Sequence, residues 1–162
     1  MKYLERQTEK LPAAGRVQRE KRCYDELSSR ICKEVKTLKT VLLIMRRASL
    51  AQGLMAKARD DPGLRLCYEP DYDRADTAIR SHQATGALLE VAEDGRQDMG
   101  YCLSLCARLR EVTPHCRLML MCPEGQTEAV HRAIEAKRKG EIDDFVFYDV
   151  SLDYLAASLQ SL

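Results

Sequence analysis

The sequence lacks both an excess of charge of either sign and any long apolar run. Its 162 residues include 26 Lys and Arg against 25 Asp and Glu, which gives a net charge of +1 and no overall attraction to nucleic acid. No apolar run approaches the roughly 18 residues that a membrane-spanning helix needs. The first 15 residues lack the uninterrupted apolar core of a secretory signal. We therefore expect a cytoplasmic protein with no membrane partner.

Patterns typical of metal and cofactor sites are also missing. The seven cysteines are odd in number and fall mostly in apolar patterns, which indicates small buried side chains in a reducing compartment. Zinc sites favour close cysteine pairs presented by turns, whereas Cys102 and Cys106 are four residues apart on a predicted helix. The turn MRRAS after the first predicted strand contains no glycine, which excludes a glycine-rich phosphate loop there. We expect no metal and no cofactor.

The charge that is present is unevenly distributed. Residues 1–40 carry 11 Lys and Arg against 6 Asp and Glu, whereas residues 41–162 carry 15 against 19. The motif LPAAG ends whatever precedes it, so residues 1–15 are predicted to form a flexible leader. One alternative function follows from this basic segment, namely a nucleic-acid-binding adaptor whose binding falls steeply with added salt.

Residues 16–38 predict an amphipathic helix, because this stretch contains no proline or glycine. Its apolar positions have spacings of 7, 3, 4, 4 and 3, and they are Val17, Tyr24, Leu27, Ile31, Val35 and Leu38. This helix is predicted either to pack on its own domain or, given its seven-residue character, to form a short coiled coil that joins two copies in a homodimer. Acidic residues between the basic ones argue against a DNA-binding helix.

From Thr40 onward, apolar runs alternate five times with helical patterns. Strands are predicted at 41–45, 64–68, 86–90, 116–122 and 143–148, and helices at 49–60, 71–83, 99–112, 125–140 and 151–162. Ser49 and Ser151 are predicted N-caps, and Gly140 is a predicted helix end. This alternation predicts a parallel sheet with helices on both faces. Sites in such sheets form at the carboxyl ends of the strands.

Three stretches, TVLLIMRRASLAQGL, GALLEVAEDG and GEIDDFVFYDVSLDYLAASL, resemble the receiver domain of bacterial response regulators. The resemblance covers residues 39–162 and implies a CheY-like, flavodoxin-like (βα)5 sheet with strand order 2-1-3-4-5, preceded by the N-terminal amphipathic helix. In that family two acids after strand one hold Mg²⁺, and an Asp after strand three accepts a phosphoryl group. A hydroxyl after strand four and a Lys after strand five bind the phosphoryl oxygens.

Carried over by position, the resemblance implies a degenerate phosphoacceptor pocket. Its positions are Met45, Arg46, Glu90, Met121 and Tyr148, with Val91 replacing Glu90 if the register slips by one. Met45 and Arg46 stand where the acid pair belongs, and neither offers the oxygen ligands that Mg²⁺ requires. The hydroxyl position is Met121 and the lysine position is Tyr148, so only the negative charge of the acceptor is kept.

Glu90 is therefore predicted to be a static charge rather than a reaction centre. A glutamate reaches one methylene further than an aspartate and carries a permanent negative charge, which crudely mimics a phosphorylated aspartate. Arg46 is expected to reach Glu90 across the strand ends and replace Mg²⁺ as its counter-charge, with Arg47 as a substitute donor. The alternative is a solvated acid without a partner.

Two further features follow from the resemblance. Phe145 matches an aromatic position that changes rotamer when receivers are activated, although plain core packing is the simpler interpretation. The family also binds partners through a face made by its fourth helix, fifth strand and fifth helix, which here includes His131, Arg132, Glu135, Phe147, Tyr154 and Ser158.

The sequence thus favours an atypical, phosphorylation-independent receiver domain of two-component signal transduction, and not an enzyme. We expect it to act as a protein-interaction or dimerisation module in bacterial signalling or transcriptional control, with unknown protein partners. A small flavodoxin-like enzyme is the competing hypothesis. It would need convergent polar groups at the strand ends, where the sequence places mainly Met, Cys and Tyr.

Overall fold

The structure is a computed structural model, and it describes residues 37–162. The predicted leader at 1–15 and the predicted helix up to residue 36, including Val17, Tyr24 and Leu27, lie outside the described residues, as do Ile31 and Val35. Leu38 is described, and its prediction as a helical residue is wrong. It lies just before the first strand and is 54% exposed. The N–H of Lys39 already donates to the carbonyl of Gly63 at 2.9 Å, which commits this stretch to the sheet.

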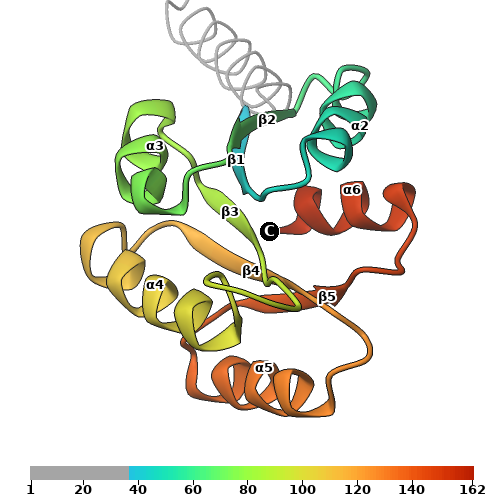
Figure 1. Cartoon of the computed structure of the whole chain (residues 1–162). Coiled ribbons are helices and arrows are strands. Elements are labelled where there is room, and N and C mark those ends of the chain that lie inside the picture. Colours follow the sequence, from blue (N-terminus) through green and yellow to red (C-terminus); the bar gives the residue numbers. More distant parts are fainter. Residues whose placement is uncertain (1–36) are drawn as a thin grey trace, which may run out of the picture. The chain divides into compact units, whose positions relative to one another are not determined.

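Five strands and five α-helices alternate along the described chain (Figure 1). They are β1 (Lys39–Ile44), α2 (Ala48–Ala58), β2 (Leu64–Glu69), a 3-10 turn η1 (Tyr72–Arg74) running into α3 (Ala75–His82), β3 (Gly86–Glu90), α4 (Met99–Val112), β4 (Arg117–Cys122), α5 (Thr127–Lys139), β5 (Asp144–Phe147) and α6 (Leu152–Ser161). All neighbouring strands are parallel, in the order β2-β1-β3-β4-β5. The predicted fold class is confirmed.

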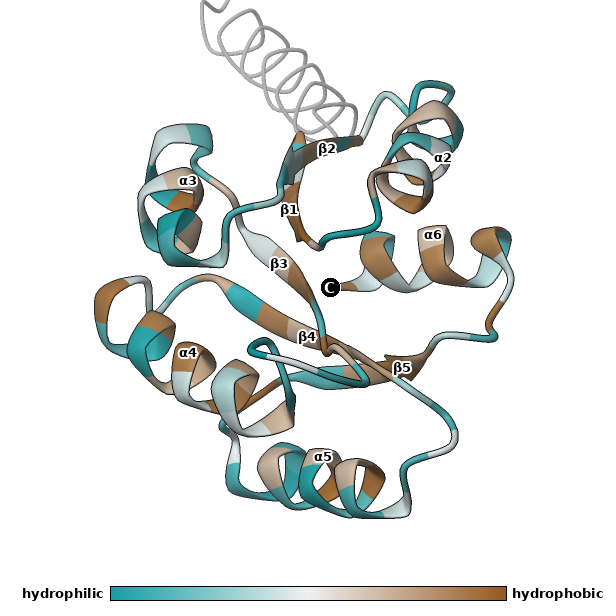
Figure 2. Ribbon diagram, viewed as in Figure 1, coloured by the Kyte–Doolittle hydropathy of each residue, from teal (hydrophilic) through white to brown (hydrophobic). Residues whose placement is uncertain are grey.

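The sheet is covered on both faces, and this explains why its central strands are apolar without alternation. Successive side chains of a strand point to opposite faces. Leu42 and Ile44 therefore pack beneath α3, α4 and α5, whereas Val41 and Leu43 pack beneath α2 and α6. The apolar residues gather along the strands and the hydrophilic ones in the connecting loops (Figure 2). Because helices cover both faces of the sheet, a site can form only where the strands end, at the amino or the carboxyl ends.

Two of the three predicted helix caps are found in the structure. The hydroxyl of Ser151 accepts the N–H of Tyr154 at 3.2 Å, and Gly140 ends α5 with φ +76°, so both predictions are confirmed. Ser49 is not the N-cap of α2, which begins at Ala48 without a side-chain cap. The preceding backbone N–H groups bind a carboxylate from another strand, so the tertiary contact sets this helix start.

The buried cysteines confirm the prediction of small core side chains for the part of the chain that the structure describes. Five of them are buried and unlinked, and they are Cys67, Cys102, Cys106, Cys116 and Cys122. Burial raises the pKa of Cys116 to about 11 and that of Cys122 to about 12, which keeps both thiols protonated near neutral pH. Within residues 37–162 no group of three His, Cys, Asp or Glu side chains is placed to hold a metal, and no helix has the length and apolarity to cross a bilayer.

Asp143 joins several elements at the amino-terminal edge of the sheet. Its carboxylate lies 2.6 Å from Nη2 of Arg110 and 3.5 Å from Nε of Arg117, and it accepts the N–H of Leu118 at 2.7 Å. Burial disfavours its charged form, but the Leu118 N–H and the two guanidinium groups outweigh that effect and lower the pKa of Asp143. Arg117 also donates to the carbonyl of Leu162 at 3.1 Å, which ties the end of α6 to the same cluster.

This cluster predicts an acid-sensitive contribution to stability. Because the folded state lowers the pKa of Asp143, its stabilisation is complete above the unfolded value of about 3.9 and disappears as the pH falls through the lower folded value. We expect Asp143→Asn to lower the free energy of unfolding by about 1–2 kcal/mol at pH 7. The difference from wild type should shrink toward pH 3, as measured by urea unfolding.

Asp144→Asn is the matched control, because Asp144 pairs with Lys137 while both side chains are about half exposed. Exposed pairs of this kind contribute roughly 0–1 kcal/mol. A loss for Asp143→Asn that stays the same from pH 7 to pH 3 would contradict the assignment of the effect to the charged carboxylate.

Candidate functional site

The strand registers bring the predicted pocket residues to one edge of the sheet. Ile44 lies beside Leu89, and Glu90 lies beside Met121 in parallel pairing. Tyr148 follows β5 directly, and its N–H donates to the carbonyl of Cys122 at 3.1 Å. Because all these strands run in the same direction, their carboxyl ends place Glu90, Met121 and Tyr148 around a single pocket.

Glu90 is a buried carboxylate whose charge is already compensated. Its side chain is 7% exposed. One carboxylate oxygen, Oε2, accepts the backbone N–H of Arg46 at 2.9 Å and that of Arg47 at 3.3 Å. The other oxygen, Oε1, forms an ion pair with Nε of the Arg47 guanidinium. Both oxygens of Glu90 are therefore engaged by donors from the turn after β1.

The ion-pair partner is Arg47, and the prediction of the Arg46 side chain as donor is wrong. Arg46 contributes only its backbone N–H, and its side chain is exposed. Successive side chains of an extended segment point to opposite sides, so the backbone geometry that presents both N–H groups to Glu90 directs only one arginine inward. Sequence alone had left Arg47 as the substitute donor.

Arg47 also contacts two other residues of the pocket. Its Cζ lies 4.2 Å from the centroid of the Tyr148 ring, a cation–π arrangement. Its Nη2 lies 3.9 Å from Sδ of Met121. The guanidinium thus lies between a carboxylate, an aromatic face and a thioether. It provides the positive charge that compensates Glu90.

Tyr148 ties the end of β5 to the loop after β3. Its hydroxyl donates to the carbonyl of Val91. Burial raises the pKa of Tyr148, and the nearby charge of Glu90 raises it further, so the hydroxyl keeps its proton and remains a donor. A lysine at this position would offer a mobile cation, whereas Tyr148 offers a fixed hydrogen bond.

The other two predicted positions, Met45 and Phe145, lie in the core or pack against it. Met45 is fully buried and packs with Met121 on the α2 and α6 side. Phe145 packs on the opposite side of the sheet, where its ring contacts Phe147 edge-to-face at 5.7 Å. In the register, Phe145 lies beside Leu120, and both side chains point to the α5 side of the sheet. Met121 is the next residue after Leu120, so its side chain points to the opposite face, and the sheet separates it from Phe145. The structure does not bring this aromatic to the pocket.

Sequence reasoning missed Tyr72. Its ring is 3% exposed and its hydroxyl donates to the backbone carbonyl of Glu90 at 2.6 Å. Burial raises the pKa of Tyr72, which keeps it a donor. The available signal was that Tyr72 is the one aromatic in the otherwise polar stretch 71–83. It fixes the backbone of Glu90 from the α3 side, as Arg47 fixes the side chain from the α2 side.

The loop from 91 to 98 is held by contacts at several points. The N–H of Ala92 donates to the carbonyl of Gln97 at 2.7 Å, and Nε2 of Gln126 donates to the carbonyl of Glu93 at 2.9 Å. Asp98 caps α4 by accepting the N–H of Tyr101 at 2.9 Å. Together with the Tyr148 contact, these bonds fix the loop that follows Glu90.

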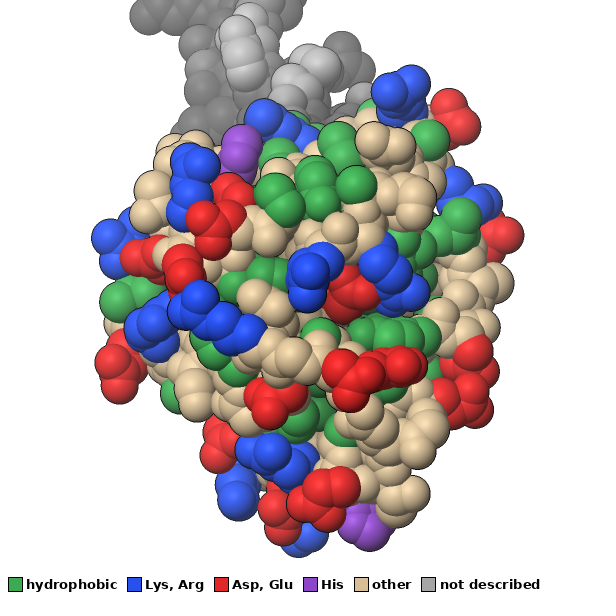
Figure 3. Space-filling view, in the orientation of Figure 1, with side chains coloured by type: hydrophobic (Ala, Val, Ile, Leu, Met, Phe, Trp, Pro, Cys, Tyr) green, Lys and Arg blue, Asp and Glu red, His purple; other side chains and the backbone are tan. Residues whose placement is uncertain are grey.

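The chemistry available at this site is limited by its charge balance. Mg²⁺ is bound by oxygen ligands, but the turn after β1 presents a methionine and two arginines. Glu90 is the one carboxylate at the pocket's centre, and its oxygens are occupied. Acidic and basic side chains are interspersed over the face seen in Figure 3. The site therefore has the properties of a closed ionic contact.

Neither models of protein families nor curated proteins give a match to the chain. Solved structures do. They include an adenylate cyclase from Rhodopirellula baltica, with 14% identity, a TM-score of 0.64, and coverage of 76% of this chain and 85% of that one. A DNA-binding response regulator of the LuxR family from Staphylococcus aureus has 12% identity, a TM-score of 0.61, and coverage of 76% and 98%.

A two-component response regulator from Clostridium difficile has 20% identity and a TM-score of 0.60, with coverage of 76% of this chain and 93% of that one. At these identities the likeness concerns the fold. The described part of the chain has the CheY-like receiver fold of response regulators, with its parallel sheet in the order 2-1-3-4-5. The predicted resemblance is confirmed at this level.

Removing the Arg47 guanidinium should destabilise the protein, because it leaves a buried carboxylate with backbone donors only. We expect Arg47→Met to lower the free energy of unfolding by about 1–3 kcal/mol at pH 7, measured by urea unfolding. Arg46→Met is the matched control, because its side chain is exposed and its N–H remains, and its effect should be within about 0.5 kcal/mol. Equal losses in the two variants would contradict the assignment.

Tyr148→Phe tests the contact between β5 and the loop separately from the ion pair. The variant keeps the aromatic face over Arg47 but removes the hydroxyl that donates to Val91. We expect a loss of about 1 kcal/mol in stability and faster amide hydrogen exchange in residues 92–98, because the Val91 carbonyl loses its donor. Unchanged exchange in this loop would show that the hydroxyl does not hold it.

Proposed function

We propose that this chain is an atypical, phosphorylation-independent receiver domain that acts as a protein-interaction module in signal transduction. The observation that carries the proposal is the compensated state of Glu90. Its side chain is 7% exposed and ion-paired with Arg47, and it accepts two backbone N–H groups. The receiver fold supports a signalling role, and the pocket supports a role without phosphoryl transfer.

Phosphoryl transfer needs a nucleophilic carboxylate oxygen, a route for the phosphoryl donor, and positive charge for the transferred group. At Glu90 the guanidinium of Arg47 is already present on the carboxylate, and the ring of Tyr148 covers it. An incoming phosphate would have to displace Arg47 from a buried partner, which breaks the ion pair from one side. The arrangement favours a permanently closed pocket.

A module of this kind would communicate through the shape of its surface. The edge of the sheet at β5 and the neighbouring helix α6 carry partly exposed aromatic side chains, namely Phe147 on the α5 side of the sheet and Tyr154 of α6 at 58% exposure. The bond from Tyr148 to Val91 fixes the end of β5 next to this edge. We propose this edge as the surface for a protein partner.

The predicted partner residues Arg132 and Glu135 lie on a different flank of α5 from the one that faces β5. Arg132 and Glu135 line a groove toward α4 and lie apart from the β5 edge. Lys137, on the other flank, pairs with Asp144 of β5. Homodimerisation through the predicted helix at 16–38, and contact with nucleic acid through the basic segment, remain proposals about residues outside the described part.

An enzymatic function is the less supported alternative. The adenylate cyclase among the similar structures carries that activity in its own description, and at 14% identity the likeness concerns the fold. The carboxyl ends of the described strands bring together two methionines, a compensated glutamate and a tyrosine that keeps its proton. We therefore propose that the chain is not an enzyme.

The test is exposure of the full chain to acetyl phosphate or beryllofluoride with Mg²⁺. We expect no gain in intact mass and no change in the tyrosine spectrum, because Arg47 already neutralises Glu90. A receiver domain that retains the acid pair and the lysine serves as the positive control in the same reaction. A covalent phosphoryl adduct on Glu90 would contradict the proposal.

A further inference from the structure

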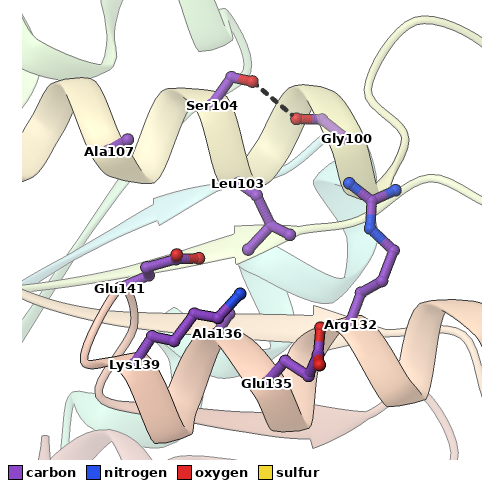
Figure 4. Close-up of a pocket in the computed structure, with 9 residues that line it drawn as sticks. All are labelled: Gly100, Leu103, Ser104, Ala107, Arg132, Glu135, Ala136, Lys139 and Glu141. Atoms are coloured by element: carbon purple, nitrogen blue, oxygen red, sulfur yellow. Dashed lines mark hydrogen bonds between the residues drawn. The ribbon is translucent and has the colours of Figure 1, made fainter.

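A groove separates α4 from α5 on the surface away from the pocket (Figure 4). It encloses about 370 Å³ and is lined by Gly100, Leu103, Ser104, Ala107, Arg132, Glu135, Ala136, Lys139 and Glu141. The α4 wall is made of uncharged residues, most of them small, and Leu103 points into the groove. The α5 wall is charged. Arg132 extends toward Gly100, and the amine of Lys139 points into the groove.

The charges on the α5 wall belong to a longer stripe of alternating sign. Glu128, Arg132, Glu135 and Lys139 are spaced by 4, 3 and 4 residues, which places them on one side of the helix. All four side chains are exposed. Within residues 37–162 none of them takes part in an ion pair, although six pairs form elsewhere in that range.

The stripe is self-complementary under a two-fold rotation. If two copies of α5 pack antiparallel about an axis midway between positions 133 and 134, Arg132 faces the partner's Glu135 and Glu128 faces the partner's Lys139. Each pair occurs twice, as an isologous contact requires. The dipoles of two antiparallel helices also align favourably. In this arrangement Glu128, in the first turn of α5, meets the partner's Lys139, in the last turn.

We propose that this groove is the contact surface for a second copy of the chain, with the two α5 helices antiparallel. Ser104 and Ala107 carry little side-chain bulk, which lets a partner's helix approach the α4 wall closely. The pairs are exposed, so the contact is weak and sensitive to salt. This surface is distinct from the predicted helix at 16–38 and from the β5 edge, and it does not depend on the proposed function.

The test uses charge reversal in the full chain, with association measured by sedimentation equilibrium at low salt. Arg132→Glu and Glu135→Arg each place like charges opposite one another at two positions of the contact. We expect each single variant to associate roughly tenfold more weakly than wild type, or worse. The double variant Arg132→Glu/Glu135→Arg restores both pairs and should associate like wild type. An equimolar mixture of the two single variants should also associate, because their charges are complementary.

Arg80→Glu is the matched control, since it makes the same change of charge on an exposed residue of α3, away from the groove, and its association should equal that of wild type. Circular dichroism checks that every variant is folded. If the predicted helix at 16–38 also joins two copies, that association would have the same strength in wild type and in all the variants. The proposal is overturned if the single variants associate as strongly as wild type. It is also overturned if the double variant and the mixture associate as weakly as the single variants.

Discussion

The ion pair between Arg47 and Glu90 is the interaction on which the carboxyl-end edge of this sheet depends. A carboxylate that is 7% exposed must be compensated within the protein, because burial without a partner costs several kcal/mol. Arg47 supplies the positive charge, and the N–H groups of Arg46 and Arg47 supply the remaining hydrogen bonds. Once these contacts form, they fix the turn after β1, the start of α2 and the orientation of the Glu90 side chain.

The neighbouring contacts convert this local pair into a rigid junction. Tyr148 lies over the guanidinium and bonds the carbonyl of Val91, and Tyr72 bonds the carbonyl of Glu90 from the opposite face of the sheet. Three strand ends and the loop after β3 are thereby joined through one charged centre. This junction is the physical basis for the proposed signalling without phosphoryl transfer.

The two flanks of α5 have different chemical characters, and this has consequences for binding. Toward β5 the surface is partly aromatic, with the half-buried rings of Phe145 and Phe147. Toward α4 the flank carries the alternating charges that include Arg132 and Glu135. Binding through an apolar surface is stabilised by the area that it buries. Binding through a charged surface is selective and depends on the salt concentration. The fold therefore presents two surfaces suited to different kinds of contact.

The sequence by itself determined the order of elements, because apolar runs and helical spacings depend on local periodicity, and it also located Glu90 at a strand end. It favoured Arg46 over Arg47 as the partner of Glu90, which was wrong, and it missed Tyr72. Those outcomes depend on how the turn after β1 and the start of α3 approach β3, which no local pattern encodes. The separation of Phe145 from Met121 was likewise decided by the tertiary structure, because only the strand register assigns each side chain to a face of the sheet.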